Sequence, residues 1–257
     1  MMEGLSGKVA FVTGGGAGIG RAVAVRLATE GCHVGVIDID RSRVDAVCEE
    51  VRKLGGRAAA ATGDVSSAGA MRSAVEELSR TVGAADILVN NAGIARLGPL
   101  LEISEKDWRD HFHINVDGVW HTCRAVVPRM IERGRGVVVN MASWLGKRGW
   151  ANYGAYCATK FAVIGLTQAL AYELARHGIR VNAVCPGLIV GTPMREAIEA
   201  EAERLGLPQA KDRIAAIPLQ RAGTPEDVAR SVAFLASDEA SYLTGTSIDV
   251  AGGLWMS

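Results

Sequence analysis

The sequence lacks the features that mark several common classes of protein. No apolar run of about 18 residues occurs in its 257 residues, so no transmembrane helix is predicted. The opening M-M-E-G-L-S-G-K has no basic region followed by an apolar core, so it does not resemble a secretory signal. Basic and acidic side chains balance at 28 each, which argues against nucleic acid or an anionic membrane surface as the main partner.

Disulfide and metal motifs are missing as well. The five cysteines (Cys32, Cys48, Cys123, Cys157 and Cys185) are odd in number and form no C-x-x-C pair. This pattern is typical of reduced, buried residues, and we expect a cytoplasmic protein. Cys157 has no cationic or histidine partner at a regular spacing, so packing explains it better than nucleophilic catalysis. The histidines form no H-E-x-x-H motif or cluster with cysteine, so no metal site is predicted.

What the chain does contain is enough apolar material for one large core. Apolar residues make up 49% of the sequence, and no repeat, low-complexity tract or linker divides it, so we predict a single domain over residues 1–257. Strand-like runs such as K-V-A-F-V-T (8–13) and H-V-G-V-I-D (33–38) alternate with helical patterns. This rhythm predicts an α/β fold, a Rossmann-like doubly wound parallel sheet with helices on both faces.

A glycine-rich turn, T-G-G-G-A-G-I-G (13–20), joins the first predicted strand to the first predicted helix. Strand, glycine turn and helix form the context that a dinucleotide-binding loop requires. Glycines let the backbone approach a pyrophosphate, whose charge is met by N–H groups at the helix N-terminus. A glycine turn without a ligand is the alternative for a lone motif, but here the second strand closes a βαβ unit.

Asp38 ends that second strand, where an acidic residue would bind the adenosine ribose hydroxyls. A carboxylate at this position repels a 2′-phosphate, so NAD is predicted in preference to NADP. Ala17 agrees, because an arginine at its position in the loop could have met that phosphate. Arg41 is basic and near Asp38 in the sequence, which keeps NADP open as an alternative.

Tyr156 and Lys160 begin a long apolar-periodic run that predicts a helix. Their i,i+4 spacing places both side chains on one face. A positive neighbour favours the phenolate, so we expect Lys160 to lower the pKa of Tyr156 from its usual value of about 10. Tyr156 could then exchange a proton with an alcohol or carbonyl oxygen, and Ser143 could supply a hydroxyl to the same oxygen. Taken alone, the pair also fits an amphipathic surface.

Several motifs in one order make the chain resemble the classical short-chain dehydrogenase/reductase family over nearly its whole length. T-G-x-x-x-G-x-G is present at 13–20, N-N-A-G at 90–93 and P-G at 186–187, and the Asn-Ser-Tyr-Lys tetrad of that family falls on Asn115, Ser143, Tyr156 and Lys160. The resemblance implies that Tyr156 is the general acid/base and that Ser143 hydrogen-bonds the reacting oxygen. It also implies that Lys160 binds the nicotinamide ribose and that Asn115 helps to hold a proton-relaying water.

The resemblance further implies cofactor contacts from Gly14, Gly16, Gly18, Ile19, Asp38, Asp64, Val65, Asn90, Gly93, Tyr156, Lys160, Pro186, Gly187, Ile189 and Thr192. Thr192 departs from the family pattern P-G-x-x-x-T, because P-G-L-I-V-G-T places it one residue late. We expect Gly191 to form a one-residue bulge, so that Thr192 still reaches the nicotinamide carboxamide. The alternative is that this contact is lost.

The substrate end is the least defined part of the site. By resemblance, segment 188–216 covers the substrate, although its charged pattern also fits a solvated helix face. Trp144, Trp150 and Tyr153 would suit a hydrophobic or cyclic alcohol, and core or subunit-interface positions are the alternative. Arg96 could reach an anionic substrate group or simply lie exposed.

Together these features predict an oxidoreductase that transfers a hydride between NAD(H) and a secondary alcohol or ketone. One alternative is an NADP-dependent biosynthetic ketoreductase of the 3-oxoacyl type, and another is a non-catalytic dinucleotide-binding sensor of the same fold. The resemblance implies a homotetramer, with the main interface on the helices that contain Trp120 and Leu166. Polyol, sterol, cyclic terpene alcohol and 3-oxoacyl carrier chain all remain open as substrates.

Overall fold

The computed structural model describes residues 1–256. Seven strands form one sheet in the order β3-β2-β1-β4-β5-β6-β7, with every neighbouring pair parallel. The strands are β1 (Val9–Thr13), β2 (His33–Asp38), β3 (Ala58–Thr62), β4 (Ile87–Asn90), β5 (Gly136–Met141), β6 (Ile179–Pro186) and β7 (Ser247–Val250). The strand order reverses between β1 and β4, and ligands of such sheets lie beyond the carboxyl ends of the strands at this point.

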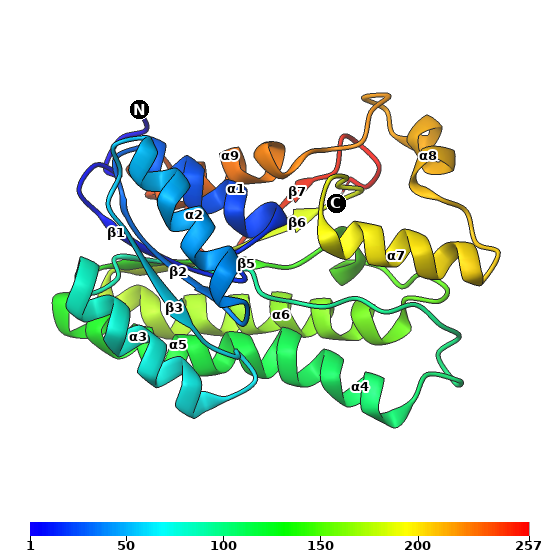
Figure 1. Cartoon of the computed structure of the whole chain (residues 1–257), viewed down its shortest axis with the longest axis horizontal. Helices are drawn as coiled ribbons and strands as arrows, with labels where there is room; N and C mark the ends of the chain where they lie inside the picture. The colour runs from blue at the N-terminus through cyan, green and yellow to red at the C-terminus, as the bar shows by residue number, and fades with distance from the viewer. Residues whose placement is uncertain (257) are drawn as a thin grey trace.

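The helices are α1 (Gly18–Thr29), α2 (Arg41–Lys53), α3 (Ala68–Val82), α4 (Glu105–Phe112), α5 (Gly118–Arg133), α6 (Gly154–Leu174), α7 (Pro193–Arg204), α8 (Ala210–Arg213) and α9 (Pro225–Ala236). Figure 1 shows α1, α2 and α9 on one face of the sheet and α3, α5 and α6 on the other. The predicted doubly wound fold is therefore confirmed.

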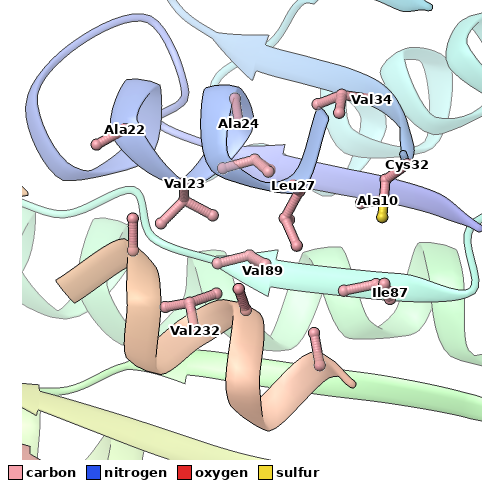
Figure 2. Close-up of a cluster of buried hydrophobic side chains, with 14 of the residues drawn as sticks. Ala10, Ala22, Val23, Ala24, Leu27, Cys32, Val34, Ile87, Val89 and Val232 are labelled. Carbon is pink, nitrogen blue, oxygen red and sulfur yellow. The ribbon is translucent and has the colours of Figure 1, made fainter. Parts of the chain in front are cut away.

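The central strands are short apolar runs because helices cover both faces of the sheet. All five residues of β1 are buried, and its alternate side chains enter different cores. Val12 packs beneath α1 and α9, whereas Phe11 packs beneath α3 and α5. In Figure 2, Val23 and Leu27 of α1 lie close to Val89 of β4. Full burial of one such side chain contributes roughly 1.5–3 kcal/mol.

Polar caps fix where several helices begin. Ser67 Oγ accepts a hydrogen bond from the Ala70 amide at the start of α3. Thr224 and Asp227 form a capping box at the start of α9 and satisfy two amides that the helix leaves unpaired. The caps set the ends of the loops at the carboxyl edge of the sheet, where the predicted site residues lie.

All five cysteines are buried free thiols. Burial raises the pKa of the Cys157 thiol, which agrees with the packing interpretation. Among residues 1–256, no three His, Cys, Asp or Glu side chains are grouped so that they could hold a metal ion. Within the same range, every helix is too short or too polar to span a membrane.

Candidate active site

A cavity of about 370 Å³ lies at the carboxyl ends of the strands. The catalytic candidate Ser143 lines this cavity, and so do all but two of the predicted cofactor residues. Those that line it are Gly14, Gly18, Ile19, Asp38, Asp64, Val65, Gly93, Tyr156, Lys160, Pro186, Gly187, Ile189 and Thr192. Loops far apart in the sequence therefore converge on one site, as the parallel sheet requires.

The glycine loop between β1 and α1 depends on residues without side chains. Gly14 and Gly18 have φ values of 59° and 51°, a left-handed conformation that favours glycine. At Gly20 a Cβ atom would lie 2.1 Å from the Gly14 carbonyl oxygen, so α1 packs directly on the turn. This packing aims the N-terminus of α1 into the cavity.

Gly16 and Asn90 are the two predicted cofactor residues that do not line the cavity. Both make hydrogen bonds that support residues near the cavity. The Gly16 amide donates a hydrogen bond to Asp38 Oδ2 at 3.0 Å, and Asn90 is buried, where it donates to Asn140 Oδ1 at 2.9 Å. Asn90 therefore joins β4 to β5 below the site.

Asn91 lines the cavity in place of Asn90. Its side-chain amide donates to the carbonyls of Thr13 and Gly14 at 3.1 and 3.0 Å. It thus fixes the N-N-A-G segment to the glycine loop. The sequence-based list omits Asn91, although the second asparagine of N-N-A-G was the available signal.

Arg43, rather than Arg41, is the basic residue beside Asp38 on the cavity wall. The Arg43 Nε atom lies 3.1 Å from Asp40 Oδ2. Arg41 pairs with Asp45 at 2.8 Å on the exposed face of α2 and does not line the cavity. The sequence analysis named Arg41 as the basic residue that keeps NADP open, but Arg43 is the one that lines the cavity.

Ser143 and Tyr156 meet on the cavity wall. Ser143 lies two residues beyond β5, and its Oγ accepts a hydrogen bond from the Leu145 amide at 3.1 Å. Tyr156 comes from the first turn of α6, and its phenol lies close enough to the Ser143 hydroxyl for Ser143 to lower the pKa of the phenol. A carbonyl oxygen of a substrate at this place would have two hydroxyl groups within reach.

Lys160 is buried one turn further along α6. Its Nζ donates to the Met141 carbonyl at 2.7 Å and lies 5.6 Å from the centre of the Tyr156 ring. Burial lowers the pKa of Lys160 to about 8, because the charged form is poorly solvated there.

The pKa of Tyr156 is raised, and not lowered as the sequence-based interpretation expects. Burial raises the pKa of Tyr156 to about 12. The Ser143 hydroxyl and the positive charge of Arg195 act in the opposite direction and lower it in part. Arg195, in the first turn of α7, is thus a cation whose charge acts on the phenol, and the sequence-based site does not include it.

Asn115 lies behind the cavity wall in a π-helical turn, His113–Asp117, between α4 and α5. Its Oδ1 accepts from the Ile94 amide at 2.8 Å, and its Nδ2 donates to the Ile94 carbonyl at 2.9 Å and to Thr159 Oγ1 at 3.0 Å. Asn115 therefore holds the chain that follows Gly93. Its role in proton relay stays a prediction.

Thr192 lies at the cavity wall despite its shifted position. Gly191 absorbs the extra residue with a φ of 71°, and Thr192 Oγ1 then accepts a hydrogen bond from the Arg195 amide at 3.1 Å as the N-cap of α7. The positive φ of Gly191 agrees with the predicted bulge. Contact of Thr192 with a nicotinamide carboxamide stays a prediction.

The four substrate candidates divide into two pairs. Trp144 and Tyr153 line the cavity, whereas Trp150 and Arg96 do not. Trp150 packs on Trp144 with 5.4 Å between ring centres. Arg96 forms ion pairs with two aspartates of α4, which corrects its assignment to the substrate site.

Segment 188–216 contains α7 and α8, which Figure 1 shows together at one end of the sheet. Ile198 and Ala202 of α7 pack in one apolar cluster with Trp144 and Tyr153. The segment therefore lies over the part of the cavity that contains Tyr156. The Tyr153 hydroxyl is buried and has no hydrogen-bond partner among residues 1–256.

Comparison with known proteins agrees with this geometry. A family model described as "Enoyl-(Acyl carrier protein) reductase" matches residues 14–255. Oxidoreductase UcpA of Salmonella typhimurium is 42% identical over 97% of this chain and 95% of its own length. The 3-oxoacyl-[acyl-carrier-protein] reductase FabG of Staphylococcus aureus is 40% identical over 97% and 98%, respectively. The chain belongs to the classical short-chain dehydrogenase/reductase family.

Solved structures of short-chain dehydrogenases/reductases superpose closely on this one. Levodione reductase gives a TM-score of 0.90 at 35% identity and covers 96% of this chain and 97% of its own. A putative NAD(P)-dependent gluconate 5-dehydrogenase from Beutenbergia cavernae, with NADP bound at low occupancy, gives 0.88 at 41% identity and 97% coverage of both chains. The present chain is thus an oxidoreductase of this family, which uses a nicotinamide dinucleotide.

The cavity of this short-chain dehydrogenase/reductase fits such a cofactor. Backbone amides at the start of α1 would hold the diphosphate. Asp38, Tyr156 and Lys160 line the same cavity, and their contacts with the adenosine ribose and the nicotinamide ribose stay predictions. A Cβ atom at Gly18 would come within 3.2 Å of Thr192, so the glycine keeps open the space between the loop and α7.

Proposed function

We propose that the protein interconverts a secondary alcohol and its ketone with NAD(H), using Tyr156 as general acid/base. One observation carries this proposal: Ser143 and Tyr156 share a cavity with Lys160, and Asp38 lies on the same cavity wall. Within that cavity a single ligand can place its nicotinamide beside the phenol and its adenosine ribose beside the carboxylate.

In the direction of carbonyl reduction, Tyr156 donates a proton to the oxygen that becomes the hydroxyl. Burial keeps the phenol protonated near neutral pH, as this step requires. Ser143 holds the same oxygen by a second hydrogen bond, and the Lys160 ammonium stabilises the phenolate that remains. The nicotinamide, when bound, supplies or accepts the hydride. In alcohol oxidation Tyr156 takes the proton instead.

The preference for NAD rests on the Asp38 carboxylate, which would accept hydrogen bonds from the ribose hydroxyls and repel a 2′-phosphate. A second candidate is an NADP-linked ketoreductase of the 3-oxoacyl type. The position of Arg43 on the cavity wall favours it, as do the 40% identity to FabG and the NADP in the gluconate 5-dehydrogenase structure. Since Asp40 already pairs with Arg43, we favour NAD.

The first experiment is a fluorescence titration of the purified protein with NADH and with NADPH, repeated on Arg43→Ala. Our proposal expects tighter binding of NADH and little change in the variant. Tighter binding of NADPH that is lost in Arg43→Ala would instead support the second candidate. A panel of secondary alcohols and ketones with the preferred cofactor then tests turnover, and a protein that binds the cofactor but turns over none of them would contradict the proposed reaction.

A further inference from the structure

Arg195 is the one arginine of α7 that faces the cavity, and its place on that helix is unusual. Arg195, Ile198 and Ala202 follow one another at helical spacing on the buried face, where Ile198 also lines the cavity. Only 16% of the Arg195 side chain is exposed. A cation in the first turn of a helix opposes the helix dipole, so helix stability does not account for this arginine.

The hydrogen bonds made by Arg195 leave much of the guanidinium unused. Its Nη1 lies 3.4 Å from Glu199 Oε1, and its Nε lies 3.4 Å from the Ile189 carbonyl oxygen. Both distances exceed the usual range for strong charge-assisted bonds. The other oxygen of Glu199 accepts a 2.7 Å bond from the Ala210 amide. A guanidinium offers five N–H donors, so this partly buried cation can take a further acceptor.

The two carboxylates of the cavity wall lie at one end of it, together with Arg43. Asp38 ends β2 and Asp64 follows β3, at the edge of the sheet expected to hold the adenosine. Lys160 and Arg195 lie near Tyr156, and among the described residues that line this end none is a carboxylate. Trp144, Met194 and Ile198 add apolar side chains to the cavity wall, so an anion there would be attracted with little screening by water.

We propose that Arg195 binds a carboxylate of the substrate, so that the enzyme prefers oxo acids and hydroxy acids to neutral ketones and alcohols. This inference rests on the proposed reaction at Tyr156. The diphosphate of the cofactor is the other oxyanion that could reach Arg195. The amides at the start of α1 already suit the diphosphate, whereas Arg195 lies close enough to Tyr156 for its charge to act on the phenol.

The test compares matched acids and esters: 3-oxobutanoate, 4-oxopentanoate and 5-oxohexanoate against their methyl esters. Wild type is expected to reduce the best acid with a kcat/KM at least tenfold above that of its ester. Arg195→Met should lose about tenfold or more on the acid and change little on the ester, with Arg195→Lys in between. Arg204→Met is the control, because this exposed arginine lies at the far end of the same helix. It should retain the preference for the acid.

Equal activity on acid and ester in wild type, or an unchanged acid preference in Arg195→Met, would overturn the inference. An unchanged preference together with NADH binding weakened tenfold would assign Arg195 to the cofactor diphosphate. If no ketone is turned over, calorimetric titration of the NADH complex with the three acids decides the point separately. Acid binding that Arg195→Met abolishes supports the carboxylate site even though the proposed reaction fails, and acid binding that is absent or insensitive to Arg195 refutes it.

Discussion

The Asp38 carboxylate accepts a hydrogen bond from the backbone amide of Gly16 at 3.0 Å. Its second oxygen accepts one from the Asp40 amide at 3.2 Å. The residue expected to select the ribose therefore also fixes the glycine loop that would hold the diphosphate. Two functions depend on one side chain, and substitutions can separate them.

Asp38→Ala is expected to weaken NADH binding about tenfold, because both the ribose contact and the support of the loop are removed. Asp38→Asn keeps an acceptor for the Gly16 amide and removes the charge that repels a 2′-phosphate. It should therefore improve NADPH binding with a smaller loss on NADH. Fluorescence titration of both variants measures these affinities. An unchanged ratio of NADH to NADPH affinity in Asp38→Asn would refute the role of the charge.

Tyr156→Phe is expected to reduce turnover by about 10²- to 10⁴-fold, the usual contribution of a general acid/base. NADH affinity should stay within about twofold, since the ring and the cavity wall are kept. Tyr242→Phe, at a fully exposed tyrosine, is the matched control and should behave as wild type. A Tyr156→Phe protein with full activity would exclude this mechanism and favour the non-catalytic sensor.

The pH dependence should differ between the two directions of the reaction. Since burial raises the pKa of Tyr156 to about 12, the phenolate that accepts a proton becomes more abundant as pH rises, and alcohol oxidation should speed up from pH 7 to 10. Carbonyl reduction needs the phenol, so it should be level up to about pH 8. Above that pH it should decline, because Lys160 loses its proton there. Initial rates in both directions across this range provide the measurement.

The charge of Arg195 is expected to affect the pH dependence of alcohol oxidation. Its charge lowers the pKa of the phenol, so Arg195→Met is expected to displace the rise in alcohol oxidation to higher pH. The comparison uses a neutral alcohol, so that substrate binding at Arg195 does not enter. A profile identical to that of wild type would show that the charge of Arg195 does not reach the phenol.

Tyr153→Phe is expected to be as stable as wild type or more stable, by about 1 kcal/mol. The hydroxyl that it removes is buried without a hydrogen-bond partner among residues 1–256, and such a group carries a desolvation cost. Urea denaturation of this variant and of Tyr242→Phe gives the difference. A marked loss of stability in Tyr153→Phe would mean that the hydroxyl has a stabilising partner.

We propose that the chain forms a homotetramer through α5 and α6. Trp120 of α5 and Phe161 of α6 are large apolar side chains that are each 48% exposed. The double variant Trp120→Glu/Phe161→Glu should dissociate into smaller species in light scattering, and Leu101→Glu, at an exposed loop residue, should not. A wild-type protein with the mass of one chain would contradict the proposal.

The fold and most of the cofactor site follow from local sequence. Short apolar runs give the parallel strands, and the ends of those strands place Asp38, Asp64 and Gly93 at one edge. It is harder to predict which side chains of a helix face the cavity. α2 begins at Arg41 after the cap Asp40, and this start turns Arg41 outward and Arg43 toward Asp38.

Properties that depend on packing between distant segments could not be predicted. The sequence of the charged run 195–204 does not indicate which face of the helix is buried. In the structure the buried face is the one that carries Ile198 and Ala202, which pack in one cluster with Trp144. The pKa of Tyr156 is dominated by burial, which the spacing of Tyr156 and Lys160 does not reveal. Arg96 was misassigned because its carboxylate partners lie on α4, a separate segment of the chain.

The single-residue bulge at Gly191 has a consequence for how substrate scope can change in this enzyme. One residue added or removed ahead of an α-helix rotates its side chains by about 100° if the helix itself stays in place. Deletion of Gly191 would restore the family spacing P-G-x-x-x-T between Gly187 and Thr192. Either the residue at which α7 begins or the residues of α7 that face the cavity would then have to change. A short insertion or deletion in this loop, without any substitution, can therefore replace Arg195 at the cavity wall and alter which compounds are accepted.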